Sequence, residues 1–375
     1  MIFKLRTNKT TYTFTEKFYS LNLTLILLVL LLGIISCFVM YSTDNGQFNY
    51  HTKSHIYRFV IFFILFILLS FLNINFWYKY AYIFYALFLI LLVGVEFWGL
   101  TASGSKRWLD VFIFNLQPSE LMKVGVVIFL AKYYHKISSD DVNNIKYFMK
   151  PLVALSIPIF LIIAQPDLGT AVLIAAAGLI MFWLAGVSVK YFFYSSIGIF
   201  TLLPIIIAFL KPYQKLRILT FLNPERDPLG AGYQIIQSKI AVGSGGLFGK
   251  GFLKGSQSYL DYLPEKHTDF IFTLFSEEFG FLGSGTLLLL YLSLIFVIIN
   301  IGKRSRSYFA RSFCYGFASV FFVCVVVNMS MVLGLLPIVG SPLPILSYGG
   351  SAMLTTMLGL AIVMSCHLHK DEYLT

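Results

Sequence analysis

Long apolar runs recur along the whole chain and constrain its fold more than any other feature. A transmembrane helix needs roughly 20 apolar residues, and about ten such runs occur here. Because 58% of the residues are hydrophobic and only 12% are charged, we predict an all-α, polytopic membrane protein in which residues 1–375 form a single membrane domain. The first run is too long for a cleaved signal peptide, so we expect a retained anchor helix. The predicted helices cover residues 21–41, 56–72, 78–98, 117–134, 148–164, 169–187, 190–210, 269–300, 308–336 and 347–367.

The basic residues follow the expected membrane topology. The formal net charge is +11, a value that also occurs in nucleic-acid-binding proteins. Here Lys and Arg concentrate in the N-terminal arm and in alternate connections, notably residues 132–150 and 303–311, whereas the short opposite connections hold few, namely Lys53, Arg58, Lys106 and Arg107. The positive-inside rule therefore predicts that both termini lie in the cytoplasm, and we expect no nucleic-acid partner.

One long connection, residues 211–268 between the seventh and eighth predicted helices, is expected on the outer side of the membrane. Within it, residues 233–242 place apolar side chains at helical spacing, which predicts a short helix on the outer membrane surface. Arg217 is an outer cation that can meet either an anionic substrate group or an ordinary lipid headgroup, and Lys239 is another. The polar positions of the predicted surface helix include Gln234, Ser238 and Lys239.

A glycine-rich run, GSGGLFGKG at 243–251, follows this helix. Its spacing does not fit a nucleotide-binding loop, because Gly251 stands where Ser or Thr is required. We expect the glycines to let the backbone approach the membrane or a substrate closely, and a phosphate-binding nest of amides is an alternative.

Charge is concentrated at residues 256–281, where the eighth apolar run begins. Thr268 or Asp269 can cap the helix that starts there, and this is the simplest role for both. Alternatively, a carboxylate at the membrane edge, desolvated and close to other acids, has a raised pKa that suits a general base near neutral pH. The neighbours that motivate this second interpretation of Asp269 are Glu265, His267, Glu277 and Glu278.

Polar residues inside other apolar runs also need an explanation. Glu120 and Lys123 share one helix face and can neutralise each other, either at a functional site or as a structural link between helices. Asp167 follows Pro166 at a helix start, where an N-cap is the simplest account. Trp108 is either an aromatic anchor at the membrane interface or part of a site. The cysteines lie in apolar runs without metal-ligand spacing, so no metal site is predicted.

Several motifs together resemble the SEDS family of cell-shape and cell-division membrane proteins. The resemblance spans most of the chain in order, and the form of the segment that ends in HTDF is closer to the elongation branch of the family than to the division branch. The motifs are GSKRWLD (104–110), LQPSELMKV (116–124), QPDLGTA (165–171), the segment 221–272, SEEFGFLG (276–283) and GLLPIVGSPLPILSYGGSAML (334–354).

This resemblance implies a peptidoglycan glycosyltransferase that polymerises lipid II at the outer face of the bacterial cytoplasmic membrane during cell elongation. The family's catalytic acid, in the HTDF motif, maps onto Asp269. Its implied role is to take the proton from the acceptor 4-hydroxyl as that oxygen attacks the donor strand, which leaves undecaprenyl pyrophosphate behind. Cations are then needed beside the departing pyrophosphate. The substrate-binding residues expected from the motifs and from the polar positions are Trp108, Glu120, Lys123, Arg217, Gln234, Ser238, Lys239, His267, Thr268, Ser347 and Gly349.

The same resemblance implies partners and leaves two alternatives open. The expected partners are lipid II, undecaprenyl-pyrophosphate-linked glycan, a class B penicillin-binding protein transpeptidase and other membrane proteins of the elongation complex. A divalent cation, Mg²⁺ or Mn²⁺, can assist the leaving group, although no ligand set is evident in the sequence. One alternative is a lipid II flippase, which the intramembrane Glu120 and Lys123 would suit. The other is a non-enzymatic scaffold for a penicillin-binding protein, in which Asp269 only caps a helix.

Overall fold

The computed structural model describes residues 14–102, 105–111, 115–138, 140–209, 212–227, 230–255 and 265–374. A helix lies at each of the predicted apolar runs. Seven helices in the described part of the chain are long and apolar enough to cross a membrane, which confirms the prediction of an all-α, polytopic membrane protein. The bundle helices are α2 (Leu23–Thr43), α3 (Tyr50–Ser70), α4 (Ile74–Trp98), α5 (Pro118–His135), α6 (Ile145–Ala164), α7 (Leu168–Leu184), α8 (Val189–Phe209), α12 (Ile271–Arg304), α13 (Tyr308–Val332) and α14 (Gly350–Leu368).

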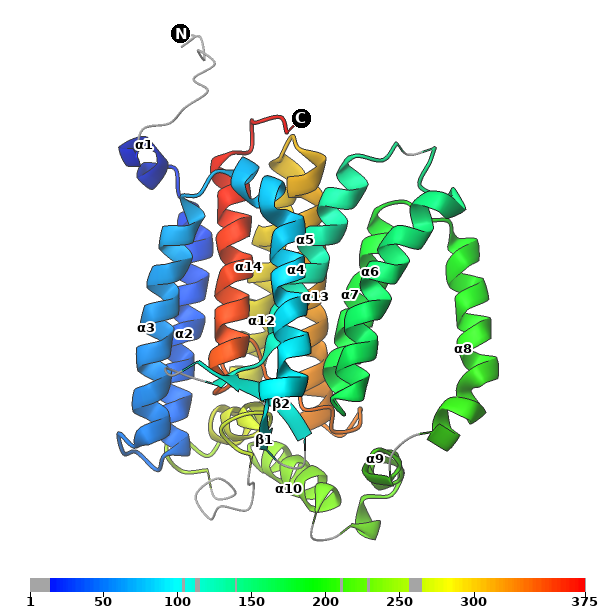
Figure 1. Cartoon of the computed structure of the whole chain (residues 1–375). Coiled ribbons are helices and arrows are strands. Elements are labelled where there is room, and N and C mark those ends of the chain that lie inside the picture. The colour runs from blue at the N-terminus through cyan, green and yellow to red at the C-terminus, as the bar shows by residue number, and fades with distance from the viewer. Residues whose placement is uncertain are drawn as a thin grey trace.

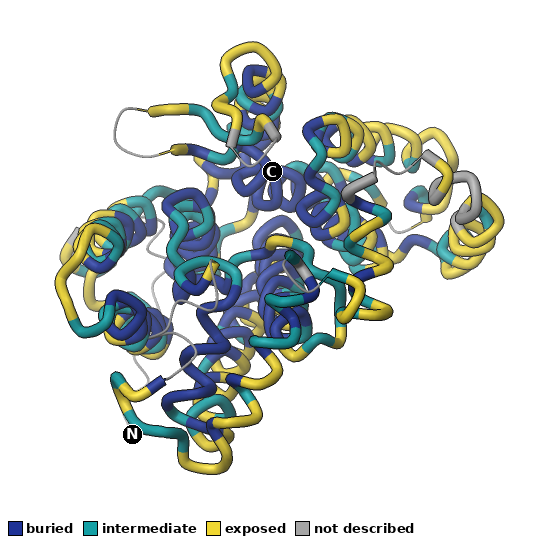
Figure 2. The backbone as a smooth tube through the Cα atoms, turned by 90° about the horizontal axis from the view of Figure 1, so that it is seen from below, coloured by how far each residue is buried: buried dark blue, intermediate teal, exposed yellow. Residues whose placement is uncertain are grey.

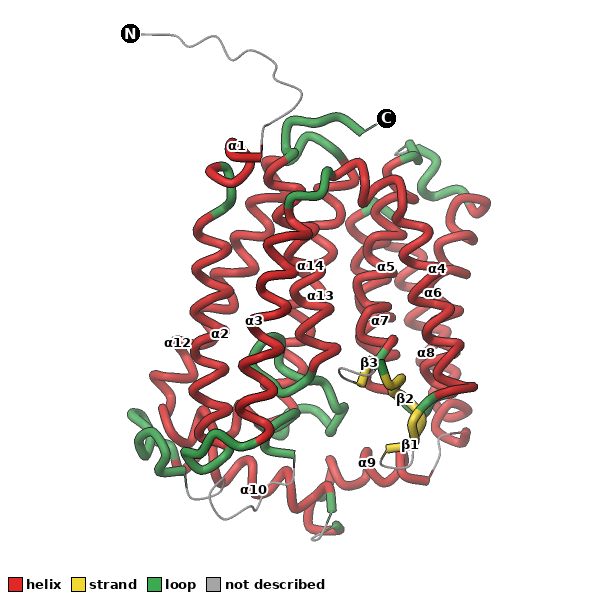
Figure 3. Tube along the Cα trace, turned by 60° about the vertical axis from the view of Figure 1, so that its left-hand side comes forward, coloured by secondary structure: helices red, strands yellow, loops and turns green. Residues whose placement is uncertain are grey.

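The remaining elements gather at the two ends of the bundle (Figures 1 and 3). Helix α1 (Phe14–Tyr19) and the last described residues lie at one end. Helix α9 (Pro212–Leu222), the short 3₁₀ helix η1 (Pro224–Arg226) and α10 (Ala231–Ser244) lie at the opposite end, together with three short strands. This arrangement agrees with an even number of membrane crossings.

Polar side chains start several helices where the sequence changes from a connection to an apolar run. The Asn22 side chain accepts a hydrogen bond from the Leu25 N–H (3.0 Å) at the start of α2. Asp167 accepts one from the Thr170 N–H (3.2 Å) at the start of α7. Each bond satisfies a backbone donor that the first helical turn leaves free. The predicted N-cap role of Asp167 is confirmed.

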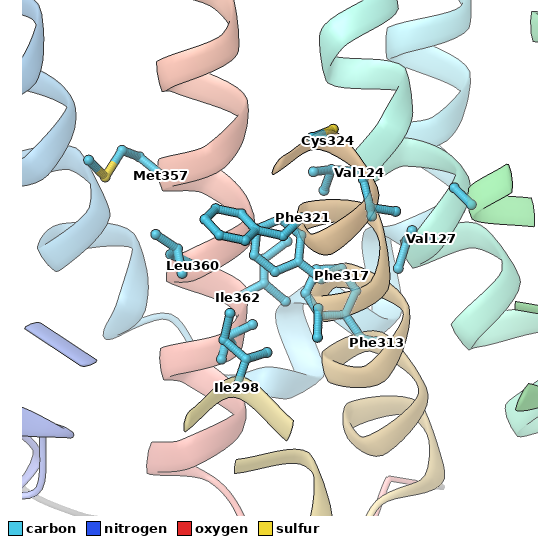
Figure 4. Close-up of a cluster of buried hydrophobic side chains, with 14 of the residues drawn as sticks. Val124, Val127, Ile298, Phe313, Phe317, Phe321, Cys324, Met357, Leu360 and Ile362 are labelled. Atoms are coloured by element: carbon cyan, nitrogen blue, oxygen red, sulfur yellow. The ribbon is translucent and has the colours of Figure 1, made fainter. Parts of the chain in front are cut away.

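The centre of the bundle is packed with aromatic and branched side chains (Figure 4). Phe313, Phe317 and Phe321, four residues apart on α13, are all buried. Gly359 of α14 gives Phe317 room, because an added Cβ there would lie only 2.0 Å from the ring. Burial is highest at the centre and falls towards the outside (Figure 2). Large apolar side chains such as Leu27 and Phe38 are exposed on that outer surface, as expected for helices that face lipid.

A small sheet before α5 is a feature that the sequence did not predict. Strands β1 (Leu100–Ala102), β2 (Ser105–Asp110) and β3 (Asn115–Leu116) pair antiparallel in the order β1-β2-β3. Leu109 pairs with Leu116 between β2 and β3. The sheet fixes the connection that carries the RWLD sequence at the end of the bundle.

The predicted surface helix at 233–242 is confirmed as α10, but it is not only a surface element. Its Ser238 is fully buried. The Ser238 hydroxyl donates to the Val332 carbonyl of α13 and lies 3.2 Å from the Thr273 hydroxyl of α12. Helix α10 is therefore held against the bundle.

The connection between α13 and α14 replaces the ends of two predicted helices. Helix α13 stops at Val332 instead of residue 336, and α14 begins at Gly350 instead of residue 347. The backbone turns at Gly334 (φ +68°), and prolines follow it. Leu343 and Leu346 are nonetheless buried, so this non-helical chain is enclosed by protein, which is where a membrane protein tolerates it.

The glycine-rich run 243–251 folds against α12 at the point where that helix kinks, Gly280 (φ 66°). An added Cβ at Gly249 (φ +82°) would lie 2.0 Å from the Glu278 carbonyl oxygen. The glycines thus permit close approach to α12, and the N–H groups of Gly249, Lys250 and Gly251 donate to carbonyls within the protein. The bonds between the two segments are Lys250 N–H to Glu277 O, Gly251 N–H to Glu278 O, Phe281 N–H to Gly246 O and Leu282 N–H to Leu247 O.

Candidate active site

A polar cavity of about 400 Å³ lies where the strands, α9, α10 and the start of α14 meet. Its wall also includes the turn before α12 and the connection between α13 and α14. Six residues singled out from the sequence line it: Trp108, Arg217, Gln234, Thr268, Asp269 and Gly349. Other polar residues that line it are Arg107, Gln117, Glu265, Tyr348 and Ser351.

Asp269 lies in a turn whose backbone is fixed by neighbouring segments. The His267 carbonyl accepts a hydrogen bond from the Tyr348 N–H (2.9 Å). The Thr268 carbonyl accepts one from the Ser347 hydroxyl (2.6 Å). The Asp269 carbonyl accepts one from the buried Asn328 amide of α13 (2.9 Å). Three consecutive carbonyls are therefore tied to α13 and to the residues before α14.

Asp269 does not cap the helix that follows it. The N-cap position of α12 is Phe270, and no side chain makes a cap hydrogen bond there. The Thr268 hydroxyl bonds instead to the Glu265 carboxylate (2.9 Å). Capping, the simplest role for Asp269 on sequence grounds, is thus not the role that it has in the fold.

Burial raises the pKa of Asp269 to about 7, and the Glu265 carboxylate adds to the effect. The Arg217 guanidinium acts in the opposite direction, and more distant acids at Asp167 and Glu120 raise the pKa further. Because desolvation disfavours the charged form, the carboxyl exchanges its proton close to neutral pH. A group with this pKa can act as a general base at pH 7.

The acidic residues that cause this shift differ in part from those expected. Glu277 and Glu278 lie inside α12 and are buried. The Glu277 carboxylate pairs with Lys250 (2.6 Å), and Glu278 accepts from the Leu253 N–H (3.1 Å). The expectation that they surround Asp269 is wrong. They hold the glycine-rich run against the kink of α12.

Two arginines stand where the polar cavity meets an apolar groove. Arg107 and Arg217 line both the cavity and a neighbouring groove of about 300 Å³. The Arg217 guanidinium donates to the Ile338 carbonyl (3.2 Å), and Arg107 lies 4.0 Å from the Asp167 carboxylate. The groove is lined mostly by apolar side chains of α7, α9 and the α13–α14 connection, among them Leu173. A ligand with a charged head and an apolar tail fits this junction.

Glu120 and Lys123 form an ion pair of 2.8 Å in the first turns of α5. Both side chains are buried, and the Lys123 ammonium also approaches the Cys324 sulfur (3.9 Å). They line a small pocket of about 30 Å³ that shares Pro342 and Ala352 with the cavity. The pair therefore lies beneath the cavity wall, where it links α5 to α13.

Besides Glu120 and Lys123, four further residues expected to bind substrate lie outside the set of described residues that line the cavity. Ser238 is buried between α10, α12 and α13. Lys239 is exposed and runs along Gly334. Ser347 and His267 anchor the turn that carries Asp269. The Ser347 hydroxyl donates to the Thr268 carbonyl, and the His267 ring lies 3.2 Å from the Asp44 carboxylate.

The start of α14 supplies a further part of the wall. Gly349 is its N-cap residue, and Ser351 and Ala352 follow in the first turn. The Ser351 hydroxyl accepts from the Gln117 N–H (2.7 Å), which joins α14 to the start of α5. Free N–H groups and the dipole at a helix start favour an anion.

Among the described residues, no group of three or more His, Cys, Asp or Glu side chains is placed to hold a metal ion.

Sequence reasoning missed Arg107, Tyr348 and Asp44. Arg107 stands beside Trp108 in the RWLD sequence, and this adjacency was the available signal. Tyr348 lies between Ser347 and Gly349, which were both expected. Asp44 lies in the connection after α2, and nothing in the sequence relates it to Asp269.

A polytopic membrane protein with a titratable carboxylate in a polar cavity, two arginines and an adjoining apolar groove is suited to chemistry on a lipid-linked anion. Residues 18–372 match the family model described as cell cycle protein, FtsW/RodA/SpoVE. The chain belongs to this family, which is the SEDS family expected from its motifs.

Characterised relatives and solved structures agree with this membership. The chain is 40% identical to the peptidoglycan glycosyltransferase MrdB of Escherichia coli K12 over 360 residues, which cover 96% of each chain. It is 34% identical to stage V sporulation protein E of Bacillus subtilis, over 94% of this chain and 98% of that protein. Among solved structures, a chain of a peptidoglycan synthase complex that coordinates polymerization and crosslinking matches with a TM-score of 0.81 and 29% identity, over 94% of this chain and 99% of that one. RodA of Thermus thermophilus has the same fold, with a TM-score of 0.71 and 24% identity over 94% of this chain and 98% of that one.

Proposed function

We propose that Asp269 is the general base with which this chain polymerises lipid II into glycan strands. The chain is a peptidoglycan glycosyltransferase, the activity for which its relatives MrdB and FtsW are named. The observation that carries the proposal is the position of Asp269. It is a partly buried carboxyl with a pKa of about 7 in a polar cavity that adjoins an apolar groove.

In the proposed reaction, Asp269 accepts the proton of the acceptor sugar's 4-hydroxyl. The oxygen attacks the anomeric carbon of the donor strand, and the bond from that carbon to the pyrophosphate breaks. The pyrophosphate departs with the electron pair, and the proton stays on Asp269 until it passes to water. The transition state carries positive charge on the sugar and negative charge on the leaving group.

Arg107 and Arg217 are placed to stabilise the departing pyrophosphate. Both stand between the cavity that holds Asp269 and the apolar groove. The sugar thus occupies the polar side, the pyrophosphate lies between the guanidinium groups, and the polyprenyl chain follows the groove. The start of α14 adds backbone N–H groups on the cavity side. Trp108, Gln234 and Thr268 are the remaining wall residues that we assign to sugar binding.

The two alternative functions explain the geometry less well. A transporter usually places its polar groups at the midplane of the membrane, whereas here β2, α9 and α10, which supply residues of the polar cavity, lie at one end of the bundle. The intramembrane Glu120 and Lys123 neutralise each other (2.8 Å). A scaffold in which Asp269 is only a helix cap conflicts with the N-cap at Phe270.

We propose the bacterial cytoplasmic membrane as the location, with both termini in the cytoplasm and the cavity outside. The placement of α1 and the C-terminal residues at the end opposite the cavity supports this topology (Figure 1). The proposed partner is a class B penicillin-binding protein that cross-links the strands, within an elongation complex of membrane proteins. The similarity to a chain of a peptidoglycan synthase complex supports such a partner.

The test is strand synthesis from purified lipid II by the protein reconstituted with its transpeptidase partner. Asp269→Asn should abolish polymer, since the amide has nearly the same shape but cannot accept the proton. Asp140→Asn, an exposed carboxylate in the connection between α5 and α6, is the matched control and should keep full activity. Lipid II flipping into vesicles is measured in parallel. If folded Asp269→Asn protein makes polymer at the wild-type rate, the proposal is refuted. Loss of lipid II flipping in that variant would then favour a flippase.

A further inference from the structure

The side chain of His267, two residues before Asp269, contacts the connection between α2 and α3. Its Nε2 atom lies 3.2 Å from the Asp44 carboxylate. The ring stacks on His51 with centroids 4.4 Å apart and an interplanar angle of 29°. His267 is not among the described residues that line the cavity. A ring in this place holds the turn and does not contact the substrate.

The group that His267 meets is itself fixed. The other oxygen of Asp44 accepts hydrogen bonds from the Thr52 N–H (2.9 Å) and the Thr52 hydroxyl (2.6 Å). Asp44 is buried, and Thr52 is completely buried. The carboxylate therefore cannot swing with the turn, and it gives His267 a stationary partner at the junction of α2 and α3.

Charge favours the same arrangement. Burial and the neighbouring His51 lower the pKa of His267, while the hydrogen bond to Asp44 raises it in part and Lys266 lowers it. His267 is therefore neutral at pH 7, and one ring nitrogen donates while the other accepts. Since Asp44 is an acceptor, Nε2 carries the hydrogen and donates to it.

The anchor continues to the cavity wall. The His51 ring meets the Tyr348 ring edge to face, with centroids 5.0 Å apart. Tyr348 lines the cavity, and its ring lies under the Arg58 guanidinium (4.8 Å). The Tyr348 N–H also binds the His267 carbonyl. The histidine pair thus joins the turn and the wall of the cavity to α3.

We infer that Asp44 and His267 are positioning residues that fix the direction of the Asp269 side chain from outside the cavity. This inference rests on the proposed role of Asp269. The three backbone bonds to Tyr348, Ser347 and Asn328 fix where the turn lies, and the His267–Asp44 contact fixes how it is rotated. A displacement of about 1 Å at a reacting group can cost roughly 100-fold in rate, so loss of this contact lowers the rate although neither residue touches the substrate.

The experiment compares steady-state polymerisation by reconstituted variants, with thermal stability measured on each. Asp44→Ala and His267→Ala should each lower kcat by roughly 10- to 100-fold with little change in KM. The double variant should lose no more than the stronger single variant, because both remove the same contact. His267→Gln should recover much of the rate, since its amide nitrogen can donate to Asp44 in place of Nε2.

The pH profile separates positioning from a general loss of structure. A turn that rotates towards water exposes Asp269, so the midpoint of the rate against pH should fall in Asp44→Ala and His267→Ala and return in His267→Gln. A variant that only contains less folded protein keeps the wild-type midpoint at lower amplitude. Asp140→Ala is the control and should change neither quantity. If Asp44→Ala does not fold, the comparison of His267→Ala with His267→Gln decides the question alone.

The inference and the proposed function fail in different ways. Wild-type kcat in folded His267→Ala, together with an inactive Asp269→Asn protein, overturns positioning and leaves the general base in place. Equal loss in His267→Ala and His267→Gln, or losses that multiply in the double variant, also overturns positioning. Polymer made by Asp269→Asn overturns the proposed function itself.

Discussion

The partly buried carboxyl of Asp269 makes the protein less stable near neutral pH. Its pKa rises from an ordinary value of 3.8 to about 7 in the fold. The folded state therefore holds a proton that the unfolded state has released between these two pH values, so stability falls as pH rises from about 4 to 7. Each pKa unit corresponds to about 1.4 kcal/mol, so the full cost is about 4 kcal/mol above pH 7.

Asp269→Asn removes this cost, because the amide resembles the protonated acid and does not ionise. The variant should be more stable than wild type by about 1 kcal/mol at pH 4.5 and by up to about 4 kcal/mol at pH 8.5. At roughly 2 °C per kcal/mol for a large domain, the gain in Tm approaches 8 °C at the higher pH. Thermal unfolding of both proteins across this pH range, in the same detergent, measures the difference.

The control for this experiment is Asp140→Asn, which neutralises an exposed carboxylate and should leave Tm unchanged at every pH. A gain in Asp269→Asn that does not grow with pH would mean that the carboxyl has an ordinary pKa. A loss of stability would mean that the ionised carboxylate contributes to the fold, and the reasoning about burial would be refuted.

Three further outcomes are expected. Gly249→Ala should lower Tm far more than Gly246→Ala. Both glycines have positive φ, but an added Cβ at Gly249 would lie 2.0 Å from the Glu278 carbonyl oxygen, whereas nothing lies within 4 Å of one at Gly246. Equal losses of Tm would contradict the close approach of Gly249 to α12. Glu120→Gln should lower the free energy of unfolding by roughly 3–5 kcal/mol, because Lys123 is left buried without its partner. The double variant Glu120→Gln/Lys123→Met should recover part of this loss in the same unfolding measurement. Arg217→Ala should lower kcat for lipid II by roughly 100-fold, because it removes a cation beside the departing pyrophosphate. Lys215→Ala, on the same helix, is the control. An unchanged kcat in Arg217→Ala would exclude a role of Arg217 in stabilising the leaving group.

The helices were predictable because the length of an apolar run and the width of a bilayer decide them almost alone. Their limits were less predictable where the chain stays inside the protein without being helical. Residues 333–336 and 347–349 were predicted to be helical, yet they belong to the α13–α14 connection, whose backbone turns at Gly334 and whose Leu343 and Leu346 are buried. Tertiary enclosure decides the conformation there, and composition does not contain that information.

Part of the site was predictable from residue type and motif. Asp269, Arg217, Trp108 and Gly349 line one cavity, although they come from different parts of the chain. The electrostatic argument for a raised pKa was correct, but it gave weight to Glu277, which is in fact paired with Lys250 (2.6 Å). Proximity in sequence is a poor guide to proximity in space once a helix turns side chains away.

The anchoring residues were not predictable. Asp44 is 223 residues from His267 and Asn328 is 59 residues from Asp269 in sequence, and each acts through a hydrogen bond that exists only after the helices pack. The glycine-rich run shows the same limit. Its glycines indicated a close approach, and only the fold shows that the partner is the backbone of α12 at Gly280.

The most direct test of the central claim is the pH dependence of lipid II polymerisation under single-turnover conditions, in wild type and in Glu265→Gln. Glu265 lines the cavity and helps to raise the pKa of Asp269. If Asp269 is the general base, the wild-type rate rises with pH through a midpoint near 7, and the midpoint moves to lower pH when the Glu265 charge is removed. A rate that does not change across pH 5.5–8.5, or a midpoint that stays in place in Glu265→Gln, would contradict the claim that this carboxyl accepts the proton.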